Sequence, residues 1–423
     1  MFSKELTEAY LAILSEELLP ATGCTEPIAI AYCAAKLRQL LGTLPEKVDA
    51  VCSGNIIKNV MSVVVPNTNG LKGIGAAIAV GLVAGDADKS LQVISHVTTQ
   101  QKEETKAYLD KAEIHISCGT SPCMLDIALT GTCGSDSACV RITNHHTNIV
   151  HMSKNGDVLL DMPIVASAED HLQDKSVLSV KQIVEFADSV ALSSLKPLLE
   201  PQIRCNSAIA EEGLRGGWGA QIGKLLLEEN PDDIKTEARA WAAAGSDARM
   251  SGCEMPVIIL SGSGNQGITA SMPVVRYAKR IGASEEQLYR ALAVADLVTI
   301  HQKTGIGRLS AYCGAISAGC GCGAGICYLL GGDYDDIAHT LVNAVAILSG
   351  TICDGAKPSC AAKIAMAVEA GIMGYEMMKA GKEFLGGDGI VTKGVENTIK
   401  NVGRLARQGM SETDKEIIKI MLK

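Results

Sequence analysis

The segment CDGAKPSC at residues 353–360 places two cysteines on either side of an expected helix boundary. One helix should end near Cys353, because Gly355 suits the left-handed backbone that follows a helix. Pro358 suits the first position of a new helix, so Cys360 should fall in its first turn. The free N–H groups and the dipole at that turn favour thiolate. The segment predicts a soft-metal or iron–sulfur site, against the alternative of two buried thiols beside a tight turn.

The chain offers several cysteines for a third ligand. Cys313 lies in AYCGA, and AGCGCGAGIC holds Cys320, Cys322 and Cys327. Spacing alone does not choose among them. A further cysteine, Cys24 in TGCTEP, precedes a helix that Pro27 should begin, so the same electrostatics should bias it toward thiolate.

Two segments could supply donors to an anionic substrate. SGN, with Ser53 and Asn55, opens an expected helix, and SGSGNQG, with Ser263, Gly264 and Asn265, forms a glycine-rich loop before another. Either can present several backbone N–H groups to a carboxylate. The second also matches G-x-G-x-x-G, but helices follow it, without the second parallel strand that a dinucleotide site requires.

A general base at such a site needs a perturbed pKa. Cys24 is the first candidate, and Lys58 and His146 come next without a way to separate them. In HHTN, His146 and Asn148 could instead orient an amino group or a carboxylate.

Composition and charge exclude several classes of protein. The net charge of −9, from 38 basic and 47 acidic residues, argues against nucleic acid or an anionic membrane as partner. No apolar run reaches about 18 residues free of charge, and the N-terminus does not resemble a signal peptide, so we expect a cytoplasmic protein. Fifteen cysteines in such a compartment argue against a disulfide scaffold.

The elements that must hold these residues are of two kinds. Between about residues 45 and 165, short alternating segments such as AEIHIS and SACVRITNHH predict strands mixed with a few helices. From about Ser176 onward helical patterns dominate, as they do in the first two segments of the chain. We therefore expect an α+β fold with a discontinuous, mainly helical iron–sulfur domain and an inserted antiparallel α+β domain. The helical domain takes residues 1–43 and 170–423, and the insertion takes residues 44–169.

The combination of motifs is more specific than any one of them. The chain contains TGCTEP, SGNIIKNV, HHTNIV, CNSAIAEEGLRGGWG, SGSGNQGITASMPV and CDGAKPSC. Together these segments resemble the L-cysteine desulfidase family, which is related to the α-chain of iron–sulfur-dependent bacterial L-serine dehydratase. The likeness covers nearly the whole chain. It implies that Cys313, Cys353 and Cys360 hold a [4Fe–4S] cluster with one iron free, and that Cys24 lies close to that iron.

Two departures from the serine dehydratases favour the desulfidase branch. The chain has no separate β-domain, and it ends in IIKIMLK without the C-terminal cysteine that some of them place on the open iron. The resemblance thus implies a lyase that converts L-cysteine to pyruvate, ammonia and sulfide by non-redox β-elimination.

Three other functions remain open at this stage. An open iron also binds hydroxide, so an iron–sulfur L-serine dehydratase is the alternative within the same class of enzyme. A pyridoxal-phosphate lyase would need a Schiff-base lysine, which no motif marks. A non-catalytic iron–sulfur electron-transfer protein should have four protein ligands and little need for anion-binding loops. The expected partner is a small L-amino acid, with neither nucleic acid nor membrane, and a homodimer could form.

Overall fold

A computed structural model describes residues 2–22, 25–121, 123–164, 173–307 and 310–423. The chain divides into two compact units. The helical unit comprises Met1–Thr22, Leu172–Cys353 and Pro358–Thr413, and the sheet unit comprises Gly23–His171, Asp354–Lys357 and Asp414–Lys423. Helices and a large sheet occur in one chain, as the expected α+β class requires.

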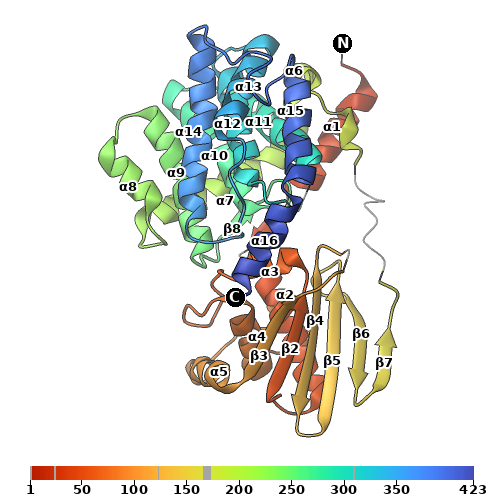
Figure 1. Cartoon of the computed structure of the whole chain (residues 1–423). Helices are drawn as coiled ribbons and strands as arrows, with labels where there is room; N and C mark the ends of the chain where they lie inside the picture. Colours follow the sequence, from red (N-terminus) through yellow and green to blue (C-terminus); the bar gives the residue numbers. More distant parts are fainter. Residues whose placement is uncertain (1, 23–24, 122, 165–172, 308–309) are drawn as a thin grey trace. The chain divides into compact units, whose positions relative to one another are not determined.

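The sheet unit is built on six strands in the spatial order β3-β2-β4-β5-β6-β7 (Figure 1). Their bounds are β2 Lys47–Cys52, β3 Glu113–Cys118, β4 Asp126–Cys133, β5 Asp136–Thr143, β6 Ile149–Lys154 and β7 Asp157–Asp161. The expected antiparallel sheet is corrected to a mixed one, because β2 pairs with β3 in parallel while the other neighbours are antiparallel. The chain between β2 and β3 forms helices, and a crossover of this kind returns a strand in the parallel direction.

Small residues allow the helices of the sheet unit to pack closely. These helices are α2 Thr25–Leu41, α3 Gly54–Val60, α4 Gly73–Ala84, the 3₁₀ helix η1 Ala87–Gln92 and α5 Thr99–Lys111. Helix α2 packs on β4, β5 and α4. A Cβ added at Gly81 of α4 would collide with the backbone of Ala31 in α2. The apolar core of this unit therefore forms around α2, between the sheet and α4.

The helical unit contains long helices and one short strand pair. Its elements are α1 Lys4–Glu17, β1 Pro20–Thr22, η2 Lys175–Val177, α6 Val180–Ser189, α7 Leu192–Arg215, α8 Ile222–Glu229, α9 Ile234–Met250, β8 Pro256–Ile258, α10 Gly264–Ile281, α11 Glu285–Ile306, α12 Gly314–Leu329, α13 Tyr334–Leu348, α14 Cys360–Lys379, α15 Val395–Arg404 and η3 Leu405–Gly409; α16 Ser411–Met421 continues into the sheet unit. Within the described ranges, no helix has the length and apolarity needed to cross a membrane.

Helices α10, α12 and α14 run in the same direction. Figure 1 shows these three helices and α9 close together in the helical unit. Gly319 of α12 lies against Ala367 of α14, and one turn later Gly323 lies against Gly371. Contacts between α12 and α10 also advance in the same order along both helices. The N-termini of the three helices therefore lie at one end of the helical unit.

Candidate functional site

Three cysteines of the helical unit lie together at this end. Cys313 is the N-cap residue of α12, and Cys360 is the first residue of α14. The Cys313 side chain hydrogen-bonds with Cys353, and Cys360 is close enough to act on it electrostatically. The bond to Cys353, burial of the thiol, and repulsion from both neighbours raise the pKa of Cys313 well above its usual value. Thiols that oppose one another's ionisation in this way favour a cation that would bind all of them as thiolates.

Backbone hydrogen bonds hold two of these cysteines side by side. Tyr312 and Ile352 form an isolated antiparallel bridge. The Cys313 N–H donates to the Thr351 carbonyl at 3.0 Å, and the Cys353 N–H donates to the Ala311 carbonyl at 2.6 Å. The helix expected to end near Cys353 ends earlier, at Leu348, because the intervening residues form this bridge.

The loop between Cys353 and Cys360 requires its glycine. Gly355 has φ of +91°, as expected from the sequence, and a Cβ there would collide with the carbonyl oxygen of Lys58. Asp354 and Lys357 form an ion pair within the same loop. Asp354–Lys357 belongs to the sheet unit, whereas both flanking cysteines belong to the helical unit.

The glycine-rich loop of the sequence lies beside the Cys313 helix. Ser263 is the N-cap residue of α10 and makes no side-chain hydrogen bond to its first turn. A Cβ added at Gly314, the residue after Cys313, would lie 2.7 Å from the Gln266 carboxamide. Of the substrate-binding candidates, Ser263, Gly264 and Asn265 therefore lie in the helical unit with the three cysteines.

The other candidates lie in the sheet unit. Ser53 is the N-cap residue of α3, and its hydroxyl donates to the Met124 carbonyl at 2.6 Å. Asn55 Oδ1 accepts from Asn59 Nδ2, which also donates to Glu26, each at 3.2 Å. These bonds join the start of α2 to α3.

His146 and Asn148 lie in the turn between β5 and β6. Burial, partly offset by Glu26, lowers the pKa of His146 below its usual value, and neighbouring His145 adds to the decrease. A neutral imidazole accepts a proton, as a base must. Asn148 Nδ2 donates to the Thr143 carbonyl at 3.1 Å, which stabilises the turn.

Lys58 forms a buried ion pair. Its Nζ lies 2.5 Å from Asp414 Oδ1, and the residue is 3% exposed. This bond ties α3 to the C-terminal helix of the chain. Cys24 lies outside the described residues.

The three cysteines suit an iron–sulfur cluster in donor type and in charge. Soft thiolates are the usual protein ligands of such clusters. Two of the thiols lie at N-termini of parallel helices, whose dipoles stabilise an anionic cluster. Within the described ranges, no three His, Cys, Asp or Glu side chains are arranged for a single metal ion, so the fit of these cysteines to a cluster rests on their donor type and charge.

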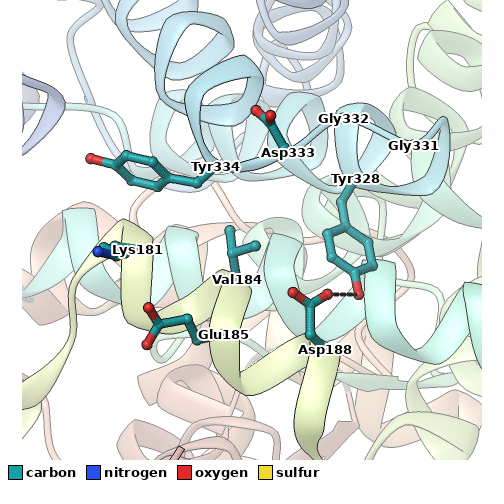
Figure 2. A pocket seen from close by; sticks show the side chains of 9 residues that line it. All are labelled: Lys181, Val184, Glu185, Asp188, Tyr328, Gly331, Gly332, Asp333 and Tyr334. Carbon is teal, nitrogen blue, oxygen red and sulfur yellow. Dashed lines mark hydrogen bonds between the residues drawn. The ribbon is translucent and has the colours of Figure 1, made fainter. Parts of the chain in front are cut away.

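A separate pocket lies at the other end of α12. It has a volume of about 390 Å³ and is lined by residues of α6 and of the turn between α12 and α13 (Figure 2). Tyr328 Oη donates to Asp188 Oδ1 at 2.7 Å across it. Tyr328 follows Cys313 by about 22 Å of helix, so this pocket is not part of the cysteine site.

The chain belongs to the serine dehydratase alpha chain family, whose model matches residues 88–419. The resemblance to that alpha chain is therefore confirmed, and membership supports a lyase of the serine dehydratase type. A UPF0597 protein of Desulfitobacterium hafniense is 58% identical over 415 residues, which cover 98% of this chain and 96% of that protein. A UPF0597 protein of Treponema denticola is 46% identical over 426 residues, covering 99% of each.

Three residues that the sequence did not single out lie beside the candidates. Glu26 takes part in the network with Asn59. Arg249 at the end of α9 donates to Asn265, and Gln266 contacts Gly314. Gln266 lies inside SGSGNQG and Glu26 inside TGCTEP, so both are in segments that the sequence marked, whereas the position of Arg249 depends on tertiary packing.

Proposed function

We propose that this chain is a [4Fe–4S]-dependent lyase that converts L-cysteine and water to pyruvate, ammonia and sulfide. The observation that carries the proposal is the grouping of three thiols, two of them at helix N-termini, in a member of the serine dehydratase alpha chain family. Cys313, Cys353 and Cys360 would hold the cluster. When bound, the cluster supplies a Lewis acid for the departing sulfur.

The chain's own residues must bind the amino acid and move one proton. The elimination breaks the Cα–H and Cβ–S bonds and forms a C=C bond, giving 2-aminoacrylate and hydrosulfide. Tautomerisation and hydrolysis then give pyruvate and ammonia. We propose that Cys24 or His146 takes the Cα proton; the lowered pKa of His146 supports a neutral imidazole at neutral pH.

Lys58 is the weaker candidate for the base. Its ammonium is paired with Asp414 in a buried position, and removing a proton from it would break that pair. We propose instead that Lys58 anchors α3, the helix that begins at Ser53 and Asn55, to the C-terminal helix through Asp414.

The second candidate function is an iron–sulfur L-serine dehydratase, because the matching family carries that description. Anaerobic protein should contain about four irons and four sulfides per chain. Pyruvate and sulfide are then measured with L-cysteine and L-serine side by side. Sulfide release from L-cysteine with little pyruvate from L-serine supports the desulfidase, and the reverse supports the dehydratase. Full activity without iron would contradict both.

Cys24 is tested separately from the cluster. The variant Cys24→Ala should keep its iron but lose turnover. A missing base should also abolish exchange of the Cα proton in deuterated water while L-cysteine still shifts the cluster spectrum. If turnover is near the wild-type rate, Cys24 is not required and His146→Gln becomes the next variant.

A further inference from the structure

Among the described residues, the N–H donors in the first turn of α10 have no acceptor. This helix has 18 residues, and its N-cap residue Ser263 makes no side-chain hydrogen bond to the turn. The first N–H groups of a helix have no partner within the helix. The positive end of the helix dipole lies at the same place. An anion at Gly264 would satisfy both.

Arg249 brings a second positive group to this turn. Its side chain crosses Gly264 so closely that a Cβ there would collide with its Nε. One Nη donates to Asn265 Oδ1 at 3.4 Å. Its Nε is buried without a hydrogen-bond partner, and no acid among the residues with described positions forms an ion pair with it. The helix end repels a guanidinium, so a bound anion would turn an unfavourable contact into two favourable ones.

Gln266 presents a buried acceptor next to the cysteines. The residue is 7% exposed, and its Oε1 is buried without a partner in the described structure. Its carboxamide lies against Gly314, which directly follows Cys313. An unpaired buried acceptor is destabilising, and an ammonium group would be a strong donor to it.

We infer that Arg249 and the first turn of α10 bind the carboxylate of a free α-amino acid, and that Gln266 Oε1 accepts from its ammonium group. This inference rests on the proposed function and adds the two anchors that the cysteines do not supply. Both anchors are in the helical unit, at the helix ends where the thiols lie. The site would therefore select amino acids with both charged groups free, and reject N-acylated or amidated ones.

Binding of L-alanine tests the anchors without elimination, because L-alanine has both charged groups and no leaving group. Its dissociation constant is measured by equilibrium dialysis on anaerobic, cluster-loaded protein. Arg249→Met and Gln266→Met should each raise this constant by about 10-fold or more, as expected for losing a hydrogen bond to a charged group. The matched control Arg280→Met, at the other end of α10, should leave it unchanged.

Two truncated ligands separate the anchors. Binding of 3-mercaptopropionate, which lacks the amine, should weaken in Arg249→Met but not in Gln266→Met. Cysteamine, which lacks the carboxylate, should show the opposite pattern. Gln266→Glu should keep or strengthen cysteamine binding, because a carboxylate also accepts from an ammonium group, and this variant guards against a loss caused by misfolding.

The outcomes distinguish this inference from the proposed function. If both methionine variants keep their iron and bind L-alanine like the wild type, the inference is wrong while the lyase proposal stands. If the wild type holds no cluster or releases no sulfide, yet L-alanine binding falls in both variants, the proposed function fails and the anchors stand. Loss of 3-mercaptopropionate binding in Gln266→Met would overturn the assignment of the ammonium group.

Discussion

The helices that pack against α12 begin in two different ways at the two ends of the helical unit. Helices α11 and α13 start with complete capping boxes, at Ser284 with Gln287 and at Asp333 with Asp336. Helices α10, α12 and α14 start without a side-chain capping bond. Contacts between α11 and α12 run in opposite orders along the two helices, so α11 begins at the other end of the unit.

The difference shows where the fold satisfies its own backbone and where it leaves donors for something else. A capping box satisfies two of the orphan N–H groups of a helix. At the uncapped end, the residues in the capping positions are Cys313, Ser263 and Ser359, with Cys360 directly after. Anionic ligands such as the proposed cluster and carboxylate would complete this end.

The largest expected effect is the loss of the cluster when a thiol at the uncapped end is removed. Cys313→Ala, Cys353→Ala and Cys360→Ala should each abolish cluster incorporation, because three thiolates anchor the proposed cluster. The buried cysteines of α12 serve as controls, so Cys320→Ala and Cys322→Ala should retain iron. Iron and sulfide per chain are measured after anaerobic reconstitution. If Cys320 proves indispensable and Cys313 does not, the third ligand is misassigned.

The loop that joins Cys353 to Cys360 gives the next largest effect. Gly355→Ala introduces a Cβ at φ of +91° and against the Lys58 carbonyl. Strain and overlap together should cost about 3 kcal/mol of unfolding free energy, measured by chemical denaturation of iron-free protein. Gly350→Ala is the control, because it shares a positive φ but has open space around it. Equal losses in the two variants would attribute the effect to backbone strain alone.

Helix α11 contains a buried acid, Asp296, whose Oδ2 has no hydrogen-bond partner in the described structure. A bound proton, in place of a ligand, can account for this unpaired atom. Asp296 is fully buried, and Gln202 Nε2 donates to its Oδ1 at 3.0 Å. Burial, partly offset by that hydrogen bond, raises its pKa from 3.8 to about 7. The folded chain therefore holds a proton that the unfolded chain releases between about pH 4 and pH 7. Stability should fall as pH rises through this window and change no further above it.

The variant Asp296→Asn removes the titration but keeps the shape. Its Nδ2 can also donate to Gln202 Oε1, which has no partner in the described structure. The free energy of unfolding of the variant, relative to that of the wild type, should be about 2 kcal/mol higher at pH 8 than at pH 5. Denaturation at the two pH values measures this gain. A constant difference between the proteins would show that Asp296 does not titrate there.

The smallest expected effect is the difference in stability between substitutions of a capping and a non-capping N-cap serine. Ser284→Ala, at the capped end, should lower the free energy of unfolding by about 1 kcal/mol. Ser263→Ala, at the uncapped end, should have almost no effect on iron-free protein, since its hydroxyl makes no capping bond. A cost for Ser263→Ala as large as that for Ser284→Ala would contradict the distinction between the ends.

The sequence by itself determined the local features of this protein. Periodicity and turn residues predicted the helices, the strands and the positive φ of Gly355, because these depend on neighbouring residues. The motifs also led to the serine dehydratase alpha chain family. Pattern alone did not reveal the parallel pairing of β2 with β3, which depends on the path of the intervening helices.

Only the tertiary structure decided which distant residues meet. Spacing could not choose Cys313 over Cys320, yet the bridge between Tyr312 and Ile352 brings Cys313 to Cys353 while Cys320 is buried within α12. Likewise, no local signal marked Arg249, which reaches Gly264 only because α9 packs against α10. Contacts between residues far apart in sequence depend on how the helices pack. A glycine allows another helix to approach closely, but the sequence does not show which helix that is.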